Sequence, residues 1–116
     1  MRVLLTGASG FIGSHFTRLA AAEGLECREG CRPGAAGHSA PARVTLEGRL
    51  PQSWPPAVEG MDAVVHLAGL TEAASPSTFD LDRVNVEFPA GLAAVAGRAG
   101  VRRFVFLSSA RVHGAR

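Results

Sequence analysis

Short apolar runs recur along the chain and are separated by polar stretches or by segments rich in glycine and proline. Apolar runs of about four to eight residues between turn residues predict strands that are buried on both faces. The predicted strands are residues 2–5, 25–31, 42–46, 62–69 and 104–107. The fourth range includes the residues by which the chain leaves the strand. The second is the least regular, because Glu26, Arg28 and Glu29 interrupt a segment that a doubly covered parallel strand would keep apolar.

Two longer stretches have the periodicity of amphipathic helices. Over residues 11–22, apolar residues recur at i, i+4, i+7 and i+8 and predict one buried stripe, made of Ile12, Phe16, Leu19 and Ala20. Over residues 77–99, the residues that predict the buried face are Leu81, Val84, Phe88, Leu92 and Val95. Pro89 removes a backbone donor inside this second helix, so we expect a kink or break near Phe88.

Glycine and proline indicate where these elements end. Gly24 and Gly100 follow the two helical stretches and are predicted to stop them. Residues 50–59 contain three prolines, which limits this segment to at most one helical turn. Residues 33–41 are rich in Gly, Pro, Ala and Ser and predict a loop. Right-handed crossovers between parallel strands then predict the strand order 3-2-1-4-5.

Three glycines, Gly7, Gly10 and Gly13, lie between the first predicted strand and the first predicted helix. Gly7 can take the positive φ that a tight exit from a strand needs, and Gly13 lets the helix pack close to the strand. A side chain at position 10 would stand between the backbone and a bound phosphate. The N–H groups of residues 9–13 are predicted to be unpaired and to converge where an anion can sit. The pattern predicts a site for a dinucleotide pyrophosphate, with a plain structural turn as the alternative.

Length and composition favour one globular domain, since 116 residues carry 47% apolar and 19% charged residues. The net charge of +2 is too small to predict a nucleic-acid or membrane partner. Cys27 and Cys31 lie too far apart along a predicted strand for a disulfide, which favours free thiols in a reducing cytoplasm. The sequence shows no signal-peptide pattern, no apolar run of membrane-spanning length and no ligand cluster with metal spacing.

The sequence resembles the extended short-chain dehydrogenase/reductase family, and within it the NAD-dependent epimerase/dehydratase group. The resemblance rests on segments that match family motifs, namely residues 6–13, 62–69, 85–86 and 104–114. It implies an α/β fold with a Rossmann-type doubly wound parallel sheet, truncated after the fifth strand. Residues 1–116 would then form an incomplete NAD(P)-binding domain from which the substrate domain is absent.

The resemblance also implies roles for individual residues. It makes Ser109 the catalytic residue that hydrogen-bonds the substrate oxygen being oxidised or protonated. His66 is expected to be a core histidine, and His113 to lie outside the chemistry. The residues implied in cofactor binding are Thr6, Gly7, Ser9, Gly10, Phe11, Ile12, Gly13, Arg32, Leu67, Ala68, Gly69 and Ser108. Two pairs depart from the family pattern, Gly48-Arg49 where the family has Gly-Asp, and Phe88-Pro89 where it has Gly-Thr.

The cofactor is expected to be NADP or NAD. In the family, a carboxylate at the end of the second strand selects the 2′-hydroxyl of NAD. Here Cys31 takes that position and Arg32 follows, and an arginine can pair with a 2′-phosphate. This favours NADP, and the alternative is that Arg32 is an ordinary solvated loop residue.

The family uses a Tyr-x-x-x-Lys pair as its acid/base group, but the sequence contains no Tyr, and all 12 of its basic residues are Arg. We therefore expect the NAD(P)-binding portion of an epimerase/dehydratase-type oxidoreductase, acting on nucleotide-linked sugars, that does not turn over by itself. The alternatives are a stand-alone dinucleotide-binding or sensor module and a non-functional gene fragment. An exposed edge on the fifth strand would promote self-association.

Overall fold

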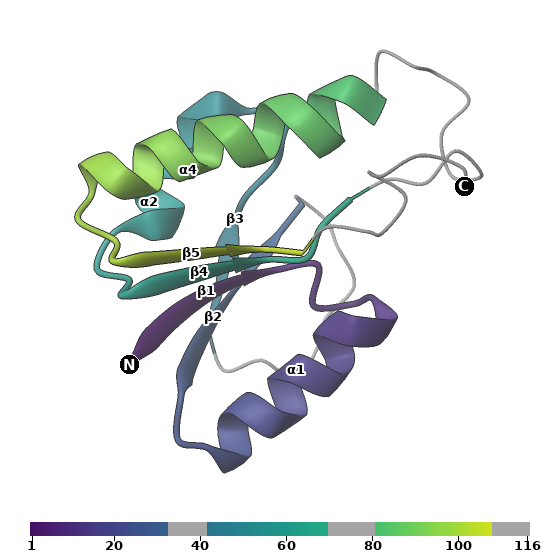
Figure 1. The fold of residues 1–116 in the computed structure, drawn as a ribbon, viewed down its shortest axis with the longest axis vertical. Coiled ribbons are helices and arrows are strands. Elements are labelled where there is room, and N and C mark those ends of the chain that lie inside the picture. Colours follow the sequence, from purple (N-terminus) through teal and green to yellow (C-terminus); the bar gives the residue numbers. More distant parts are fainter. Residues whose placement is uncertain (33–41, 70–80, 108–116) are drawn as a thin grey trace, which may run out of the picture.

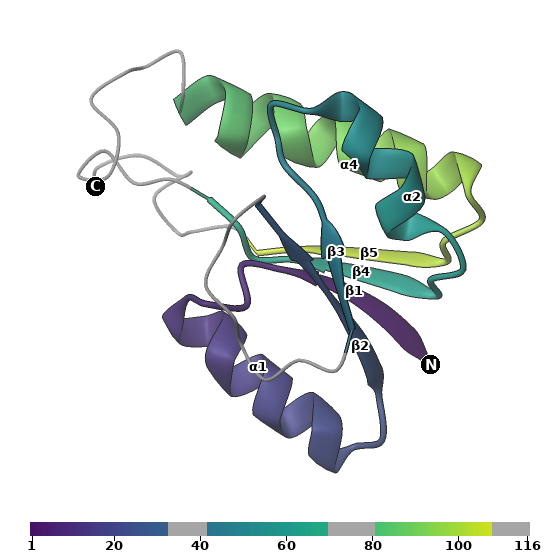
Figure 2. The same cartoon turned by 180° about the vertical axis from the view of Figure 1, so that it is seen from behind.

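Five parallel strands form the centre of the molecule, with helices on both faces (Figures 1 and 2). The computed structural model describes residues 1–32, 42–69 and 81–107. The strands are β1 (Arg2–Thr6), β2 (Glu26–Cys31), β3 (Ala42–Thr45), β4 (Ala63–His66) and β5 (Arg103–Phe106). Their order in the sheet is β3-β2-β1-β4-β5. The predicted fold class and strand order are confirmed.

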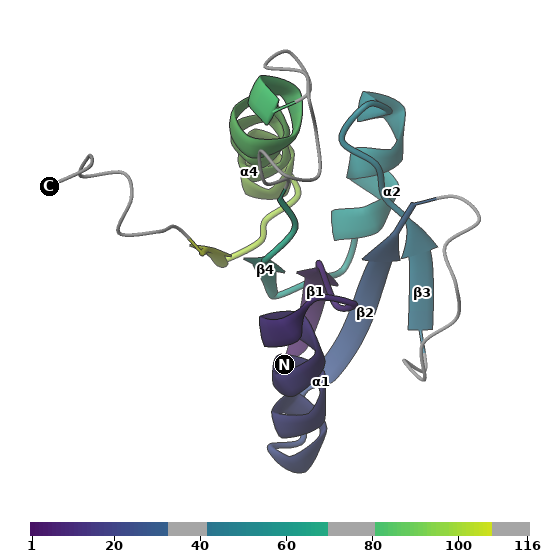
Figure 3. The same cartoon turned by 90° about the vertical axis from the view of Figure 1, so that its right-hand side faces the viewer.

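The two faces of the sheet are covered by different helices. Helix α1 (Phe11–Ala22) covers one face, and the helices α2 (Trp54–Val58) and α4 (Phe88–Arg98) cover the other (Figure 3). Alternate residues of β1 serve the two sides, with Val3 and Leu5 in the core cluster beneath α1 and Leu4 in the cluster beneath α2 and α4. The apolar run of the first strand is therefore buried on both faces, as expected for a parallel sheet.

The buried stripe of α1 differs from the prediction. Ala20 is buried and Phe16 packs against the core as predicted, but Ile12 and Leu19 are 51% and 65% exposed. The helix instead turns Gly13 toward the sheet, where the missing side chain allows the closest approach. Hydrophobic periodicity could not reveal this rotation, because glycine carries no hydrophobic signal.

The polar residues of β2 each have a structural partner. Arg28 Nη1 donates to the carbonyls of Ala57 and Glu59 at 3.0 and 2.9 Å, at the C-terminal end of α2. A cation at this end of a helix also complements the helix dipole. Glu26 pairs with Arg2 at 3.7 Å, and the buried Glu29 accepts a hydrogen bond from the Cys31 thiol. The irregular second strand is thus part of the sheet, with side chains that tie it to its neighbours.

The proline-rich segment is more helical than predicted. A 3-10 turn, η1 (Pro51–Ser53), runs directly into α2. Both elements have proline among their first two positions, where the missing N–H would have no helical partner anyway. The indole N–H of Trp54 donates to the carbonyl of Glu47 at 2.8 Å and fixes the segment to the end of β3. The expectation of at most one turn was therefore wrong.

The long C-terminal helix is interrupted where the proline predicts it. Its first predicted residues, 77–80, lie outside the described ranges. A π-helical turn, η2 (Arg83–Glu87), precedes α4, and the N–H of Phe88 bonds to the carbonyl of Arg83. Pro89 then falls in the first turn of α4, where it needs no backbone partner. The predicted break near Phe88 is confirmed as a change of helix type.

Several smaller expectations can be compared with the described residues. Gly24 and Gly100 have φ of +75° and +84° and follow their helices as predicted. Cys27 and Cys31 are free thiols, and burial raises the pKa of both. Among the described helices, none is both long and apolar enough to cross a membrane.

Candidate functional site

The turn from β1 into α1 depends on Gly7. Its φ is +74°, as predicted, a conformation that side chains rarely adopt. A Cβ at this position would lie 2.7 Å from the backbone nitrogen of Ala68 and 2.7 Å from the carbonyl carbon of Leu67. Glycine is therefore needed both for the backbone conformation and for the approach of the segment that leaves β4.

Gly13 brings α1 against this turn. A Cβ on Gly13 would lie 2.0 Å from the carbonyl oxygen of Gly7 and 2.8 Å from the Cα of Ala8. Both neighbours are backbone atoms, so they cannot move aside as a flexible side chain would. The predicted close contact between helix and strand exit is confirmed.

The start of α1 presents backbone donors without acceptors. In the described part of the chain, no hydrogen bond uses the N–H groups of Ser9, Phe11, Ile12 or Gly13. The N–H of Gly10 does have a partner, since it donates to the carbonyl of Gly7 at 3.1 Å. The expectation of unpaired donors over residues 9–13 is therefore correct for four residues and wrong for Gly10, whose N–H closes the turn.

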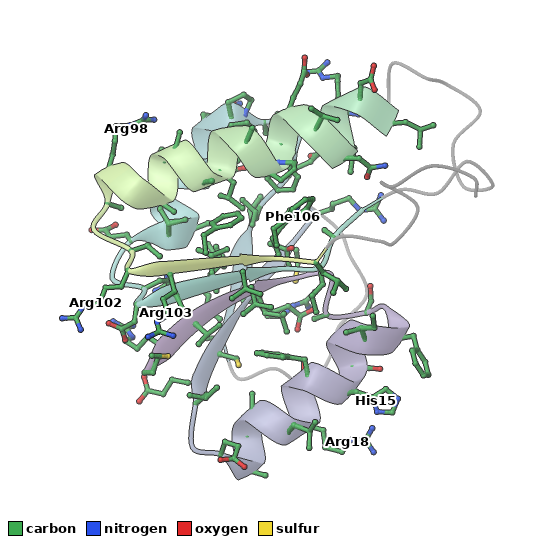
Figure 4. The ribbon with its side chains drawn as sticks, in the orientation of Figure 1. His15, Arg18, Arg98, Arg102, Arg103 and Phe106 are labelled. Atoms are coloured by element: carbon green, nitrogen blue, oxygen red, sulfur yellow. The ribbon has the colours of Figure 1, made fainter. Side chains whose placement is uncertain are left out.

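The N-cap position of α1 has room for a side chain. Among the described residues, a Cβ built on Gly10 would meet only the carbonyl oxygen of Gly7, at 3.4 Å. The side chain of Phe11 is 81% exposed and packs edge-on against His15 with ring centroids 4.8 Å apart. On the outer surface of α1, Nδ1 of His15 lies 2.7 Å from Nη2 of Arg18 (Figure 4). Unpaired N–H groups at a helix N-terminus are the geometry that can hold an anion.

Thr6 fixes the exit of β4 beside this turn. Its hydroxyl accepts hydrogen bonds from the N–H groups of Leu67 and Ala68, both at 3.1 Å. Because Thr6 is only 2% exposed, its side chain serves the fold, and it holds two of the predicted cofactor-binding residues in place. Gly69 follows as an exposed residue, and a Cβ there would lie 3.2 Å from Oδ1 of Asn85 in the π-helical turn. The sequence pattern did not predict this contact between the turn and the β4 exit.

His66 is a core residue, as expected. It is 1% exposed, and its ring lies edge-on to Phe88 with centroids 5.0 Å apart and stacks with Phe104. Nδ1 lies 2.9 Å from Oγ1 of Thr6, whereas Nε2 has no hydrogen-bond partner in the described part of the chain. Burial lowers the pKa of His66 to about 4, so the ring is neutral near pH 7.

Acidification is expected to destabilise the protein through His66. The unfolded chain binds a proton at His66 below its ordinary pKa of about 6.5, whereas the folded chain does so only near pH 4. Stability from this group is therefore complete above the unfolded pKa and is lost as the pH falls. The free energy of unfolding should drop by about 2 kcal/mol between pH 7 and pH 5. Chemical denaturation at several pH values measures this, and H66F, which cannot titrate, should lose that part of the slope.

The remaining predicted site residues are placed differently. Arg32 is exposed and directly follows β2, so it lies at the same sheet edge as the β1–α1 turn. Beside it, Arg43 Nε donates to Cys31 Sγ at 3.4 Å. Ser108 and Ser109 lie outside the described residues, although Leu107 just before them donates to the carbonyl of His66 at 3.3 Å. The carboxyl ends of parallel strands are where such sheets bind ligands.

Parallel sheet, glycine turn and unpaired N–H groups at a helix start define the class of dinucleotide-binding α/β domains. The sequence profile of the NAD dependent epimerase/dehydratase family matches residues 3–116. The chain therefore belongs to this family.

Three similar proteins put the chain in context. A 3-beta-hydroxysteroid dehydrogenase of Mycolicibacterium neoaurum is 30% identical over 93% of this chain and 32% of its own length. A short-chain dehydrogenase/reductase superfamily protein of Agrobacterium tumefaciens, solved with bound NAD, is 31% identical with a TM-score of 0.84, over 98% of this chain and 34% of its own. A UDP-glucose-4-epimerase of Stenotrophomonas maltophila, solved with bound NAD and formylated UDP-arabinopyranose, is 26% identical with a TM-score of 0.85. The match covers 100% of this chain and 39% of the epimerase. This chain spans between 30% and 40% of the length of these proteins.

Proposed function

We propose that this chain binds NAD(P) with the pyrophosphate at the start of α1, as the cofactor-binding portion of an epimerase/dehydratase-type oxidoreductase. The observation that carries the proposal is the row of N–H groups at Ser9, Phe11, Ile12 and Gly13 that have no hydrogen-bond partner in the described part of the chain. The adenosine would lie toward Arg32, and the nicotinamide toward residues 67–69 and Ser108. The similar proteins solved with bound NAD support NAD(P) as the ligand.

Titration of the chain with NADH and with NADPH, followed by nicotinamide fluorescence, tests the proposal. Saturable binding of at least one of them is expected. No binding of either at millimolar concentration would contradict the proposal and favour the alternative of a non-functional fragment. The exposed Phe11 and Ile12 offer apolar contact beside the anion site, so inorganic pyrophosphate alone should bind more weakly than the dinucleotide.

We further propose that the substrates are nucleotide-linked sugars and that these 116 residues do not turn them over alone. A bound UDP-sugar derivative in the similar epimerase supports the substrate class. Positioned acid/base groups contribute about 10²–10⁴-fold in rate, and the sequence holds neither Tyr nor Lys for that role. Ser109 would hydrogen-bond the reacting oxygen. The alternative is a stand-alone sensor module. An in-frame Tyr-x-x-x-Lys motif in the coding DNA beyond codon 116 would favour the enzyme over this alternative.

Arg32 is expected to favour NADPH over NADH. Its exposed guanidinium at the end of β2 can pair with a 2′-phosphate, and no carboxylate follows β2 to repel one. NADPH should bind about tenfold more tightly, which corresponds to roughly 1.4 kcal/mol. R32A should abolish this preference without changing NADH affinity. The matched control is R103A, which removes an exposed arginine from the amino end of β5, far from the site (Figure 4). Equal affinities for both cofactors in the unaltered chain would instead make Arg32 a solvated loop residue.

Self-association through β5 is a further part of the proposal. In the described chain β5 pairs only with β4, and Val105, Phe106 and Leu107 are 51%, 50% and 46% exposed. An open strand edge with apolar side chains can pair with a second copy. Light scattering over a range of concentrations should show a mass that rises with concentration, and a constant monomer mass would refute it.

We also propose a cytoplasmic location, because Cys27 and Cys31 are free thiols, which a reducing compartment favours.

A further inference from the structure

A buried hydrogen-bond cluster joins the carboxyl ends of β1 and β4. At its centre is Oγ1 of Thr6, which lies 2.9 Å from Nδ1 of His66 and 3.1 Å from the N–H nitrogens of both Leu67 and Ala68. Thr6 and His66 are 2% and 1% exposed. The Thr6 and His66 side chains are therefore shielded from bulk water, while the bonds to Leu67 and Ala68 are part-buried.

The number of partners fixes the direction of each hydrogen bond. A hydroxyl group has one hydrogen to donate and two lone pairs that accept. Because backbone N–H groups only donate, Thr6 Oγ1 accepts from Ala68 and from Leu67, whose N–H is shared with the Thr6 carbonyl at 3.2 Å. The hydroxyl hydrogen must then go to Nδ1 of His66, which accepts only in a neutral ring that carries its hydrogen on Nε2. Burial lowers the pKa of His66 and so favours this neutral ring.

The Nε2–H of this tautomer is left without a hydrogen-bond acceptor among the described residues. The His66 ring as a whole packs among aromatic rings, with Phe88 edge-on and the centroids of Phe104 and Phe106 6.2 and 6.0 Å away. An unpaired buried donor is unfavourable, and an apolar side chain at this position would avoid it. Apart from its ring packing, His66 therefore acts through Nδ1, the ring nitrogen that has a hydrogen-bond partner among the described residues.

We propose that His66 is a positioning residue for the dinucleotide site. By accepting the hydrogen of the Thr6 hydroxyl, it leaves both lone pairs of Oγ1 to the N–H groups of Leu67 and Ala68. These two bonds hold the β4 exit against Gly7, where the backbone contact leaves no room for a Cβ. The cofactor would lie between this exit and the start of α1, so the inference rests on the proposed function and adds a residue that acts on the cofactor through Thr6.

Two variants that both remove the ring isolate the acceptor. The amide oxygen of H66N can accept a hydrogen bond close to the position of Nδ1, whereas H66L has no acceptor. H66L should weaken NADH binding about tenfold and speed hydrogen exchange at the amides of Leu67 and Ala68 about tenfold relative to Val64. H66N should keep NADH affinity and the two exchange rates within about threefold of the unaltered chain. This should hold even if loss of the ring lowers the stability of H66N as much as that of H66L. Equal behaviour of the two variants, whether binding is kept or lost, overturns the proposal.

A measurement on the unaltered chain keeps the proposal testable even if a variant does not fold. Nitrogen-15 NMR of the His66 ring should show hydrogen on Nε2 and none on Nδ1. Hydrogen on Nδ1 would overturn the proposal, because the ring would then donate to Thr6 Oγ1 and could not accept its hydroxyl hydrogen. This measurement needs no cofactor. A chain that binds no dinucleotide yet shows the expected tautomer and exchange pattern would therefore contradict the proposed function and not the role of His66 in holding the β4 exit.

Discussion

Replacing Gly13 with alanine should lower the free energy of unfolding by about 4 kcal/mol, near the upper end of what single substitutions do. The added Cβ would lie 2.0 Å from the carbonyl oxygen of Gly7, and 2.8 Å from the Cα of Ala8. Relief requires α1 to move away from the strand exit, which exposes the core beneath Ala20 and separates the N–H groups that form the anion site. Urea denaturation measures the stability, and NADH fluorescence on the folded fraction measures the expected loss of binding.

The matched control is G97A on the surface of α4. A Cβ on Gly97 would meet nothing within 4 Å, and the residue is exposed. Alanine in place of glycine inside an exposed helix should stabilise the chain by up to about 1 kcal/mol. The two substitutions have the same chemistry and opposite expected signs. A loss below about 1 kcal/mol for G13A would mean that α1 does not pack on the turn as described.

Replacing Gly10 with aspartate should abolish dinucleotide binding while leaving the fold intact or more stable. Gly10 is the N-cap of α1 with φ −74° and ψ 173°, which any residue can adopt. A Cβ there has ordinary contact distances, and no side chain caps this helix in the unaltered chain. Aspartate in place of glycine at an N-cap adds roughly a few tenths of a kcal/mol of stability. Its carboxylate would occupy the N–H groups meant for the pyrophosphate and repel it, so NADH affinity should fall at least about a hundredfold.

The neutral G10N separates charge from bulk. Asparagine caps helices about as well as aspartate, so both variants should melt at or above the temperature of the unaltered chain. Without the negative charge, G10N should weaken binding only about tenfold. Thermal melts and fluorescence titrations of the three proteins provide the comparison. Unchanged NADH affinity in G10D would place the cofactor elsewhere.

The sheet topology and the glycine turn were predictable because they depend on local patterns. Apolar runs fixed the strands, and the handedness of crossovers fixed their order. The requirements at Gly7 and Gly13 also follow from local geometry, since a positive φ and a close helix approach are demands that the turn itself makes. Ser108 and Ser109 lie outside the described residues, and their roles stay predictions.

What the sequence could not reveal depends on contacts between distant segments. Arg28 disturbs the apolar pattern of β2 because it caps α2, whose own start is proline-rich. The rotation of α1 follows from Gly13, which a hydrophobic pattern does not register. The bond between Thr6 and His66 joins residues that are sixty positions apart in the chain. Such side-chain partners become visible only once the strands are side by side.

Backbone amide NMR during titration with NADH tests the central claim most directly. The amides of Ser9, Phe11, Ile12 and Gly13 should shift progressively and saturate together with the fluorescence signal. The amides of Gly60 and Arg103, at the amino ends of the strands, serve as internal references and should stay in place. Saturable NADH binding that leaves the four amides at the start of α1 unshifted would contradict the account.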